Sequence, residues 1–431
     1  MNYTEAINYI NDKNKYGSRL GLDCISKLLE LLGNPHLDLK YIHIAGTNGK
    51  GSTASYISHM LKEAGYKVGL FTSPYLERFN ERISINGENI PDERLAEITE
   101  RVKNTIEIML KEGYEHPTTF EIVTTIAFVY FKEENVDFVV LEVGLGGRLD
   151  STNVIKDSLI SVITTIDYDH MAELGDTLGK IAYEKAGIIK DRGLVLSYPQ
   201  SEEALEVIKE VAKSRAASLE VCPMDNVEIL KLDEFGGVFN YEYNDKAYSN
   251  LEISLIGKHQ VYNATLALTA IMMLKDRGIV EISEEALRQG LKNTKWPGRI
   301  EVLRRDPTFV IDGAHNMQGI KTLTENINRF KYKRLILGMA ILKDKEVEPM
   351  VEALTSIADE VVVTEANIHR KMDAEDLEKI VKKYNKNTHV RTDLKEAVSK
   401  AYQLADKDDL ILFAGSLYLI GDIRKIVLGN N

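Results

Sequence analysis

The sequence predicts an α/β protein in two parts: a larger N-terminal part with a mainly parallel sheet, then a smaller Rossmann-like part. Short apolar runs alternate with helical segments at both ends of the chain, which is typical of parallel strands joined by crossover helices. Residues 191–256 interrupt this alternation, and it starts again near Trp296. We therefore predict one domain at residues 1–295 and a second at residues 296–431.

The N-terminal part opens with a helix and a strand. Residues 18–32 carry apolar side chains at helical spacing and are followed by Gly33-Asn34-Pro35, while residues 39–45 form a short apolar run. After a loop of small residues, segment 55–73 predicts a helix that stops at Gly65 and leads into another strand. The order strand, loop, helix, strand favours a parallel sheet.

Two further buried strands are predicted at residues 136–143 and 159–166, with a helix at 118–135 before them and the turn GLGGRLDSTN between them. Residues 191–256 mix helical and alternating stretches, which we interpret as an elaboration that ends the first domain. Segment 259–278 predicts a helix rich in small apolar residues.

The C-terminal part is predicted from four apolar runs that alternate with helical segments. The runs are residues 307–315, 334–340, 360–366 and 409–416. This repeated alternation predicts a second α/β unit.

Composition narrows the class of protein. Of the 431 residues, 66 are Asp or Glu and 54 are Lys or Arg, a formal charge of −12 that argues against nucleic acid as the main partner. Two distant cysteines provide neither a disulfide framework nor a metal-thiolate spacing. The N-terminus is not signal-like and no apolar run is long enough to span a bilayer. We expect a cytoplasmic protein with no membrane partner.

The segment HIAGTNGKGST, residues 43–53, reads as a phosphate-binding loop between a strand and a helix. Backbone N–H groups of a glycine-rich turn can converge on phosphate oxygens, and the helix dipole adds to that attraction. Lys50 supplies a positive charge, and Ser52 and Thr53 supply hydroxyls. The usual pattern needs a glycine where Ile44 stands and a hydroxyl residue where Gly51 stands. A glycine turn with a solvated lysine is the alternative. We predict a P-loop ATPase-like domain.

Acidic and histidine side chains follow the predicted strands. Glu142 ends one strand, and Asp167, Asp169 and His170 follow the next. Ligands of open α/β sheets bind at the carboxyl ends of the strands, where a P-loop enzyme also needs a carboxylate near its magnesium ion. A helix cap or surface charge is the alternative for Glu142, and a structural role is the alternative for His170.

Several motifs together resemble one family over essentially the whole chain, in order. They are GTNGKGS, TSPYLERFNERISINGENI, LEVGLGGRLDSTN, DHMAELGDTLGKIAYEKAGIIK, GKHQVYNATLAL, WPGRIEVL, DGAHN and GSLYLIGDIR. They resemble folylpolyglutamate synthase and dihydrofolate synthase, ATP-dependent amide ligases of the Mur ligase superfamily. The loop of that family also lacks the first glycine of the usual pattern.

The resemblance implies an ATP site, two magnesium ions and a catalytic set. The ATP-binding residues would be Thr47, Asn48, Gly49, Lys50, Gly51, Ser52, Asn263, Arg299, Asp312 and His315. Ser73, Glu142 and His170 would hold the ions together with Lys185, which matches a carbamylated lysine of the family. Lys50, Glu142, His170 and Lys185 would be catalytic. Without the resemblance, Lys185 reads as a surface lysine, Asn263 as a helix cap and Arg299 as part of an interdomain turn.

The resemblance also places a pterin substrate. Its contacts would come from Thr118, Thr119, Phe120, Glu121, Leu149, Asp150 and Ser151. Residues 74–90 would form a mobile loop over it. From its helical spacing alone, Phe120 reads as a core residue. The chain departs from the family at TEANIHRKMDAEDL, so the sequence assigns no role to His369 and Arg370, and at Glu346, where an aspartate is common.

The implied reaction joins L-glutamate to a folate or to dihydropteroate through an acyl phosphate, in a monomeric enzyme. Closure of the second domain would bring Asp312 and His315 to the site. A Mur-type ligase acting on another carboxylate is one alternative, but such enzymes carry a domain before the loop, and 45 residues precede Gly46. A P-loop ATPase switch is the other, but the chain has no evident effector segment.

Overall fold

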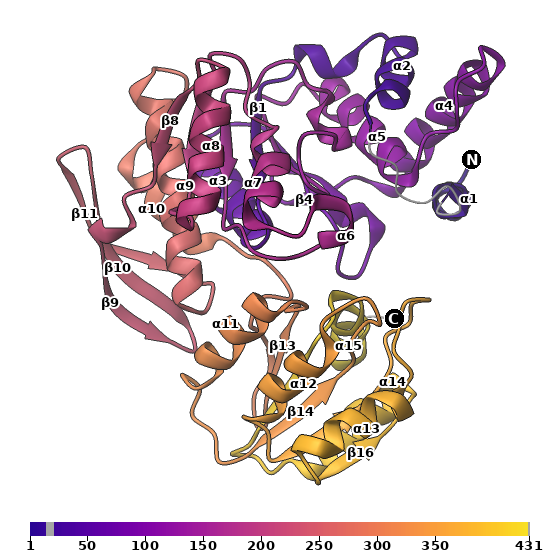
Figure 1. Cartoon of the computed structure of the whole chain (residues 1–431), viewed down its shortest axis with the longest axis vertical. Coiled ribbons are helices and arrows are strands. Elements are labelled where there is room, and N and C mark those ends of the chain that lie inside the picture. The colour runs from indigo at the N-terminus through magenta and orange to yellow at the C-terminus, as the bar shows by residue number, and fades with distance from the viewer. Residues whose placement is uncertain (14–20, 430–431) are drawn as a thin grey trace. The chain divides into compact units, whose positions relative to one another are not determined.

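The computed structural model of the chain describes residues 1–13 and 21–429 (Figure 1). The described residues divide into two units. The first consists of Met1–Glu228, Phe239–Glu252 and Tyr262–Thr294, and the second of Ile229–Val238, Ile253–Val261 and Lys295–Asn431. The last division lies beside the predicted boundary at residues 295 and 296. Two short segments before that boundary, Ile229–Val238 and Ile253–Val261, belong to the second unit, and a single boundary does not describe them. The division into two domains therefore stays a prediction.

An eight-stranded sheet forms the centre of the first unit, in the order β4-β3-β2-β5-β1-β6-β7-β8. Strand β3 pairs antiparallel with both of its neighbours, β2 and β4, and all other neighbouring strands pair in parallel. The strands are β1 (Tyr41–Ala45), β2 (Val68–Phe71), β3 (Ile83–Ile85), β4 (Glu88–Asn89), β5 (Phe138–Glu142), β6 (Ile160–Ile163), β7 (Leu194–Ser197) and β8 (Ser218–Val221).

Helices cover this sheet. They are α1 (Tyr3–Asp12), α2 (Asp23–Leu31), α3 (Lys50–Glu63), α4 (Asp92–Lys111), α5 (Thr119–Glu133), α6 (Met171–Leu174), α7 (Leu178–Ala186), α8 (Glu202–Ser214), α9 (Lys258–Asp276) and α10 (Glu284–Asn293). Short 3₁₀ helices in the described part of this unit are η2 (Pro35–Asp38), η3 (Phe79–Arg82), η4 (Ser151–Val154) and η5 (Met224–Asn226). The central strands β1 and β5 are buried at every residue, as expected of parallel strands covered on both faces.

The main core of the first unit lies between β1, β2 and β5 and the helices α1, α2, α4 and α5. Helix α3 packs against β2, β5 and α10. The predicted helix at residues 18–32 is α2, and residues 18–20 of that prediction lie outside the described part of the chain. No helix of the described residues has the length and apolar character needed to cross a membrane.

Residues 227–253 form a three-stranded sheet in the order β11-β10-β9. Its strands are β9 (Val227–Asp233), β10 (Gly236–Tyr243) and β11 (Lys246–Ile253). The alternating pattern of this stretch predicted strands, and the structure confirms them.

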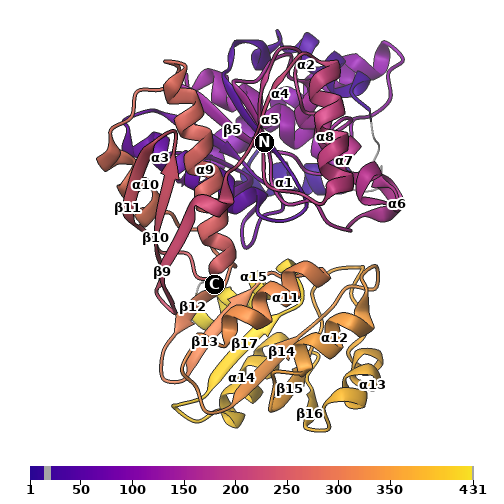
Figure 2. The same cartoon turned by 60° about the vertical axis from the view of Figure 1, so that its left-hand side comes forward.

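The second unit is a six-stranded sheet in the order β12-β13-β17-β14-β15-β16 (Figure 2). Only β12 is antiparallel to its neighbour. Its strands are β12 (Glu301–Arg304), β13 (Thr308–Asp312), β14 (Leu335–Met339), β15 (Glu360–Val363), β16 (Thr388–Val390) and β17 (Leu410–Ala414). Its helices are α11 (Met317–Ile327), α12 (Val347–Thr355), α13 (Ala374–Tyr384), α14 (Leu394–Leu404) and α15 (Leu417–Leu428). Because this unit has an almost wholly parallel sheet with crossover helices, it confirms the predicted Rossmann-like fold class.

Candidate functional site

The loop between β1 and α3 is fixed to the end of β6. Thr47 N donates to Thr165 O at 2.7 Å, and the Thr164 hydroxyl donates to Asn48 O at 2.7 Å. The Thr47 hydroxyl also lies 3.0 Å from both N and O of Asp167. These bonds hold the loop backbone in place before any ligand binds. Sequence reasoning missed Thr164 and Thr165, although two hydroxyl residues directly after an apolar strand are a usable signal.

Two glycines of this loop are required by close contacts. A Cβ atom on Gly46, where φ is +153°, would lie 1.8 Å from Thr164 Oγ1. A Cβ atom on Gly49, where φ is +84°, would lie 2.6 Å from Asn263 Oδ1. Asn263 lies inside α9 rather than before its first residue, so the alternative that it caps that helix is wrong. Its side chain instead borders the loop, where we predicted a contact with ATP.

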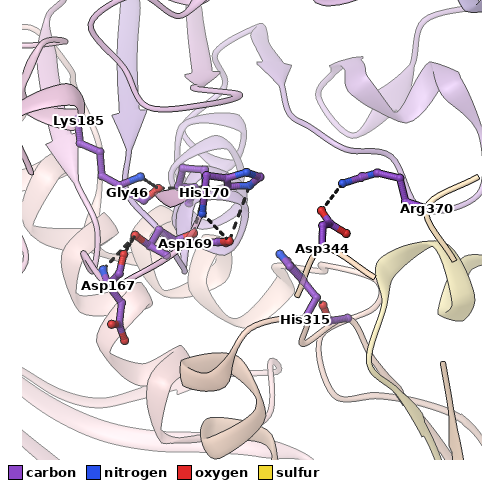
Figure 3. Close-up of polar contacts among 11 residues, drawn as sticks. Gly46, Asp167, Asp169, His170, Lys185, His315, Asp344 and Arg370 are labelled. Carbon is purple, nitrogen blue, oxygen red and sulfur yellow. Dashed lines mark hydrogen bonds and ion pairs between the residues drawn. The ribbon is translucent and has the colours of Figure 1, made fainter. Parts of the chain in front are cut away.

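Two lysines reach the same backbone carbonyl. Lys50 Nζ donates to Gly46 O at 3.1 Å and to Thr47 O at 3.2 Å. Lys185 Nζ donates to Gly46 O at 2.8 Å (Figure 3). The Lys185 side chain is buried, so the alternative of a surface lysine is wrong. Burial first, and then repulsion by Lys50, lower the pKa of Lys185 to about 7, against the opposing attraction of Asp169 and Asp150.

Ser73 and Glu142 come together because β2 and β5 are neighbouring parallel strands. Ser73 N donates to Glu142 Oε2 at 3.2 Å. The Glu142 side chain is buried at the end of β5, which excludes a simple surface charge. A buried carboxylate is costly unless hydrogen bonds or a cation compensate it.

Asp169 and His170 follow β6 along the chain. The Nε2 atom of His170 is 4.0 Å from Asp169 Oδ1, the His170 side chain is 43% exposed, and its backbone N donates to Asp169 Oδ1 at 3.0 Å (Figure 3). Within residues 1–13 and 21–429, no three His, Cys, Asp or Glu side chains gather into a metal-binding cluster. Protein ligands at a magnesium site are often few, because phosphate oxygens and water complete the shell. Ser73 with Glu142 fits one such ion.

The turn between β5 and η4 is held on two sides. Arg148 forms an ion pair with Glu184 of α7 at 2.9 Å, and Asn153 Nδ2 donates to Arg148 O and Gly187 O. Asp150 closes the turn from inside, because its Oδ2 accepts from Leu145 N at 2.9 Å and its Oδ1 accepts from Thr152 N at 3.0 Å. Leu149 accepts a bond from Gly21 N, and Ser151 is buried.

The predicted pterin residues of segment 118–121 begin helix α5. Thr118 and Glu121 form a capping box, each bonding the backbone N of the other, and both are buried. The Thr119 hydroxyl donates to Ile10 O at 3.3 Å. A Cβ atom on Gly144 would lie 2.5 Å from the Phe120 ring, so this ring lies directly over the turn. Phe120 is therefore adjacent to Gly144, the first glycine of the turn that leads to the other predicted pterin residues, Leu149, Asp150 and Ser151.

The segment predicted as a loop over the substrate is partly sheet. Residues 83–85 and 88–89 form β3 and β4, because Ile83 and its neighbours continue the buried sheet edge. Before them, the Glu81 carboxylate accepts backbone bonds from Leu76, Glu77 and Arg78. The loop is therefore shorter than predicted, and its mobility stays a prediction.

In the second unit, Asp312 ends β13. Its Oδ2 accepts from Ile300 N and its Oδ1 from Ala314 N, both at 2.8 Å, and burial raises its pKa. His315 Nδ1 lies 2.9 Å from Gly313 O, and a Cβ atom on Gly313 would lie 2.4 Å from Arg299 Nη1. The three predicted nucleotide contacts of this unit therefore gather around Gly313.

Arg370 lies elsewhere in the second unit. Its Nη1 pairs with Asp344 Oδ2 at 2.6 Å, and both side chains are exposed (Figure 3). An exposed ion pair of this kind contributes little to stability, and it gives Arg370 no catalytic partner.

Both units of the chain match known protein families. Residues 44–271 match the Mur ligase middle domain, and residues 298–417 match the glutamate ligase domain of Mur ligases. The chain is 40% identical over 429 residues to the dihydrofolate synthase/folylpolyglutamate synthase of Bacillus subtilis, covering 98% of both chains.

Solved structures give the same result. A folylpolyglutamate synthase from Thermotoga maritima is 37% identical, with a TM-score of 0.87 over 100% of this chain and 97% of the other. The folylpolyglutamate synthase of Mycobacterium tuberculosis, complexed with ADP and AMPPCP, is 30% identical, with a TM-score of 0.90 over 100% and 99% of the two chains.

Proposed function

The chain belongs to the Mur ligase family, and we propose how its first unit performs ATP-dependent glutamate ligation. It is an ATP-dependent ligase that adds L-glutamate to a folate or to dihydropteroate, as its relatives named folylpolyglutamate synthase and dihydrofolate synthase do. The observation that carries the mechanism is the convergence of Lys50 and Lys185 on the Gly46 carbonyl of the phosphate loop.

The first step is activation of the substrate carboxylate. A carboxylate oxygen attacks the γ-phosphorus of ATP, the bond from that phosphorus to the β,γ-bridging oxygen breaks, and ADP leaves. The product is an acyl phosphate. Lys50 offsets the negative charge that gathers during this transfer, and the loop backbone, fixed by Thr164 and Thr165, donates to phosphate oxygens.

The second step forms the amide. The amino nitrogen of L-glutamate attacks the carbonyl carbon, the carbon–oxygen bond to phosphate breaks, and the amine releases a proton to solvent. Inorganic phosphate is a far better leaving group than the oxygen of a free carboxylate, which explains the need for ATP. No protein nucleophile takes part.

The magnesium sites are part of this proposal. Ser73 and Glu142 would hold one ion, and His170 with a carbamylated Lys185 would hold a second. Bound there, the ions would neutralise phosphate charge. The buried Glu142 carboxylate supports the first site, and the lowered pKa of Lys185 supports the second, since only a neutral amine reacts with carbon dioxide.

We propose that folates and dihydropteroate share one pocket, lined by Phe120 and the turn at residues 144–151. The adjacency of Phe120 and Gly144 supports this pocket, because an aromatic ring can stack on a flat heterocycle. The roles of Asn263, Arg299, Asp312 and His315 toward ATP stay predictions, as does the monomeric state.

Phosphate release should depend on both acceptor substrates. With ATP and magnesium, we expect rapid release of inorganic phosphate only when a folate or dihydropteroate and L-glutamate are both present, because the acyl phosphate is consumed by the amine. Tetrahydrofolate and dihydropteroate should inhibit each other competitively. A continuous phosphate assay with each substrate omitted in turn measures this. Release with ATP alone, unchanged by either substrate, would contradict the ligase and favour an ATPase switch.

A further inference from the structure

Three buried polar side chains form a continuous chain of hydrogen bonds beside the turn at residues 144–151, which we call the pterin turn. His43 lies in the middle of β1, Thr152 in η4, and Asp150 at the N-cap of η4. His43 Nε2 is 2.9 Å from Thr152 Oγ1, and Thr152 Oγ1 is 2.6 Å from Asp150 Oδ1. His43 and Thr152 are completely buried, and Asp150 is 4% exposed. Such groups are retained in a core only where their bonds are satisfied or useful.

The direction of each bond follows from the number of hydrogens. Asp150 accepts from Leu145 N, from Thr152 N and from the Thr152 hydroxyl, so its carboxylate acts as acceptor throughout. The hydroxyl of Thr152 has one hydrogen, and it donates this hydrogen in its bond to Asp150 Oδ1. His43 Nε2 must therefore be the donor to Thr152 Oγ1.

This assignment fixes the state of the imidazole. His43 is the neutral tautomer with its hydrogen on Nε2, and its buried Nδ1 atom has no hydrogen-bond partner among the described residues. An imidazolium would place a second N–H at that position with no acceptor. Burial lowers the pKa of His43 well below its usual value, with a smaller effect from Lys190, so the neutral form persists at physiological pH.

The chain of bonds connects two functional segments. At one end, β1 leads directly into the phosphate loop, which starts at Gly46, three residues after His43. At the other end, Asp150 closes the turn that lies under the Phe120 ring. The opposite side of this turn is held separately by Arg148 and Glu184. Removing the bonds of Thr152 would therefore loosen the pterin side of the turn and leave its attachment to α7.

We propose that His43 and Thr152 are positioning residues for the folate-type substrate: through Asp150 they hold the pterin turn in register with the strand that carries the phosphate loop. This inference rests on the proposed function, because it assigns the turn to the pterin pocket. Neither residue contacts a reacting atom, so their effect falls on the affinity for the folate-type substrate.

Paired substitutions separate this role from general stability. Thr152→Val removes both bonds of the hydroxyl at nearly constant volume, whereas Thr152→Ser keeps the hydroxyl. His43→Leu removes the donor, whereas His43→Gln keeps an N–H donor. Thr124→Val is the matched control, because Thr124 is also completely buried in the first unit and its hydroxyl has no hydrogen-bond partner in the described part of the chain.

We expect Thr152→Val and His43→Leu each to raise KM for dihydropteroate or tetrahydrofolate about ten-fold, the size of one buried hydrogen bond to a charged group. KM for ATP should stay within about two-fold. The double variant should be little worse than either single one, because both interrupt the same chain. Thr152→Ser, His43→Gln and Thr124→Val should stay near the wild type.

Unchanged KM for the pterin substrate in Thr152→Val, or an equal rise in both KM values, would overturn the inference. If His43→Leu does not fold, the Thr152 pair decides the outcome. Nitrogen-15 spectra of histidine-labelled enzyme give a second readout. The signal that disappears in His43→Gln belongs to His43. In the wild type this signal should show the neutral Nε2–H tautomer from pH 6 to 8, and an Nδ1–H tautomer would overturn the assignment. A wild-type chain that ligates no substrate would refute the proposed function, while the tautomer still tests the chain of bonds.

Discussion

Replacing Lys50 by alanine is expected to lower kcat for ligation by about 10²–10³-fold, the loss typical of removing one preorganised charge from a transition state. Lys50 is the first residue of α3 and holds its ammonium group over the phosphate loop, at Gly46 O and Thr47 O. Steady-state measurement of glutamate ligation checks the loss. The fold should remain, because bonds from Thr164 and Thr165 hold the loop without this side chain.

Lys62→Ala provides the control for this experiment. Lys62 is an exposed lysine in the last turn of the same helix, and we expect its removal to leave kcat unchanged. Thermal midpoints of both variants should lie within a few degrees of the wild type, since each change removes at most one or two weak bonds. Near-normal ligation by Lys50→Ala would show that the loop does not use this charge on phosphate.

Lys185→Ala should also lose activity, by about 10²–10³-fold, because it removes the carboxylate that carbamylation would create beside the phosphate loop. Short carboxylates such as formate or acetate should restore part of the activity by occupying the vacated space. Lys180→Ala is the matched control. Lys180 lies on the same helix, its side chain is 63% exposed, and it forms an ion pair with Asp176. Full activity of Lys185→Ala without added carboxylate would count against carbamylation.

The pKa of Lys185 gives this modification a pH dependence of definite sign. The neutral amine attacks carbon dioxide, a nitrogen–carbon bond forms, and one proton is lost. With a pKa of about 7, the neutral fraction rises as pH increases through 7. At a fixed concentration of dissolved carbon dioxide, the carbamate signal in carbon-13 spectra of labelled enzyme should therefore increase from pH 6 to pH 8. A signal of equal size in Lys185→Ala would assign it to another amine.

The same shift affects the stability of the unmodified chain. The folded-state pKa of Lys185 lies below its ordinary value of 10.5. Between about pH 7 and 10.5 the unfolded chain binds a proton that the folded chain does not bind, so the free energy of unfolding rises with pH across this window. Below pH 7 both states are charged at this residue, and the cost of burying the ammonium is complete. A buried lysine whose pKa is shifted at a cost in stability is typical of a functional site.

The sequence could predict features that depend on neighbouring residues. The glycines and Lys50 of the phosphate loop, the strand before it and the helix after it lie within about 25 residues, so their pattern was sufficient. The capping box of Thr118 and Glu121 is equally local, but we assigned these residues only to the pterin site and did not predict it. The alternation of strands and helices predicted both the Rossmann-like unit and the mainly parallel sheet, and the structure confirms them.

Contacts between distant segments could not be read from the pattern. The bond from Lys185 to Gly46 joins residues 139 positions apart, and that from His43 to Thr152 joins residues 109 positions apart. Each depends on the order of strands in the sheet, which places β6 beside β1. The edge strands β3 and β4 were predicted as part of a loop, because three-residue and two-residue strands carry too short an alternation to recognise.

The central claim is that ATP activates the substrate carboxylate by phosphorylating it. The most direct measurement uses dihydropteroate or tetrahydrofolate labelled with oxygen-18 in the carboxylate that accepts glutamate. If an acyl phosphate forms, each amide bond made transfers one labelled oxygen to the inorganic phosphate released, which mass spectrometry detects. Formation of the glutamate adduct together with unlabelled phosphate would contradict the account.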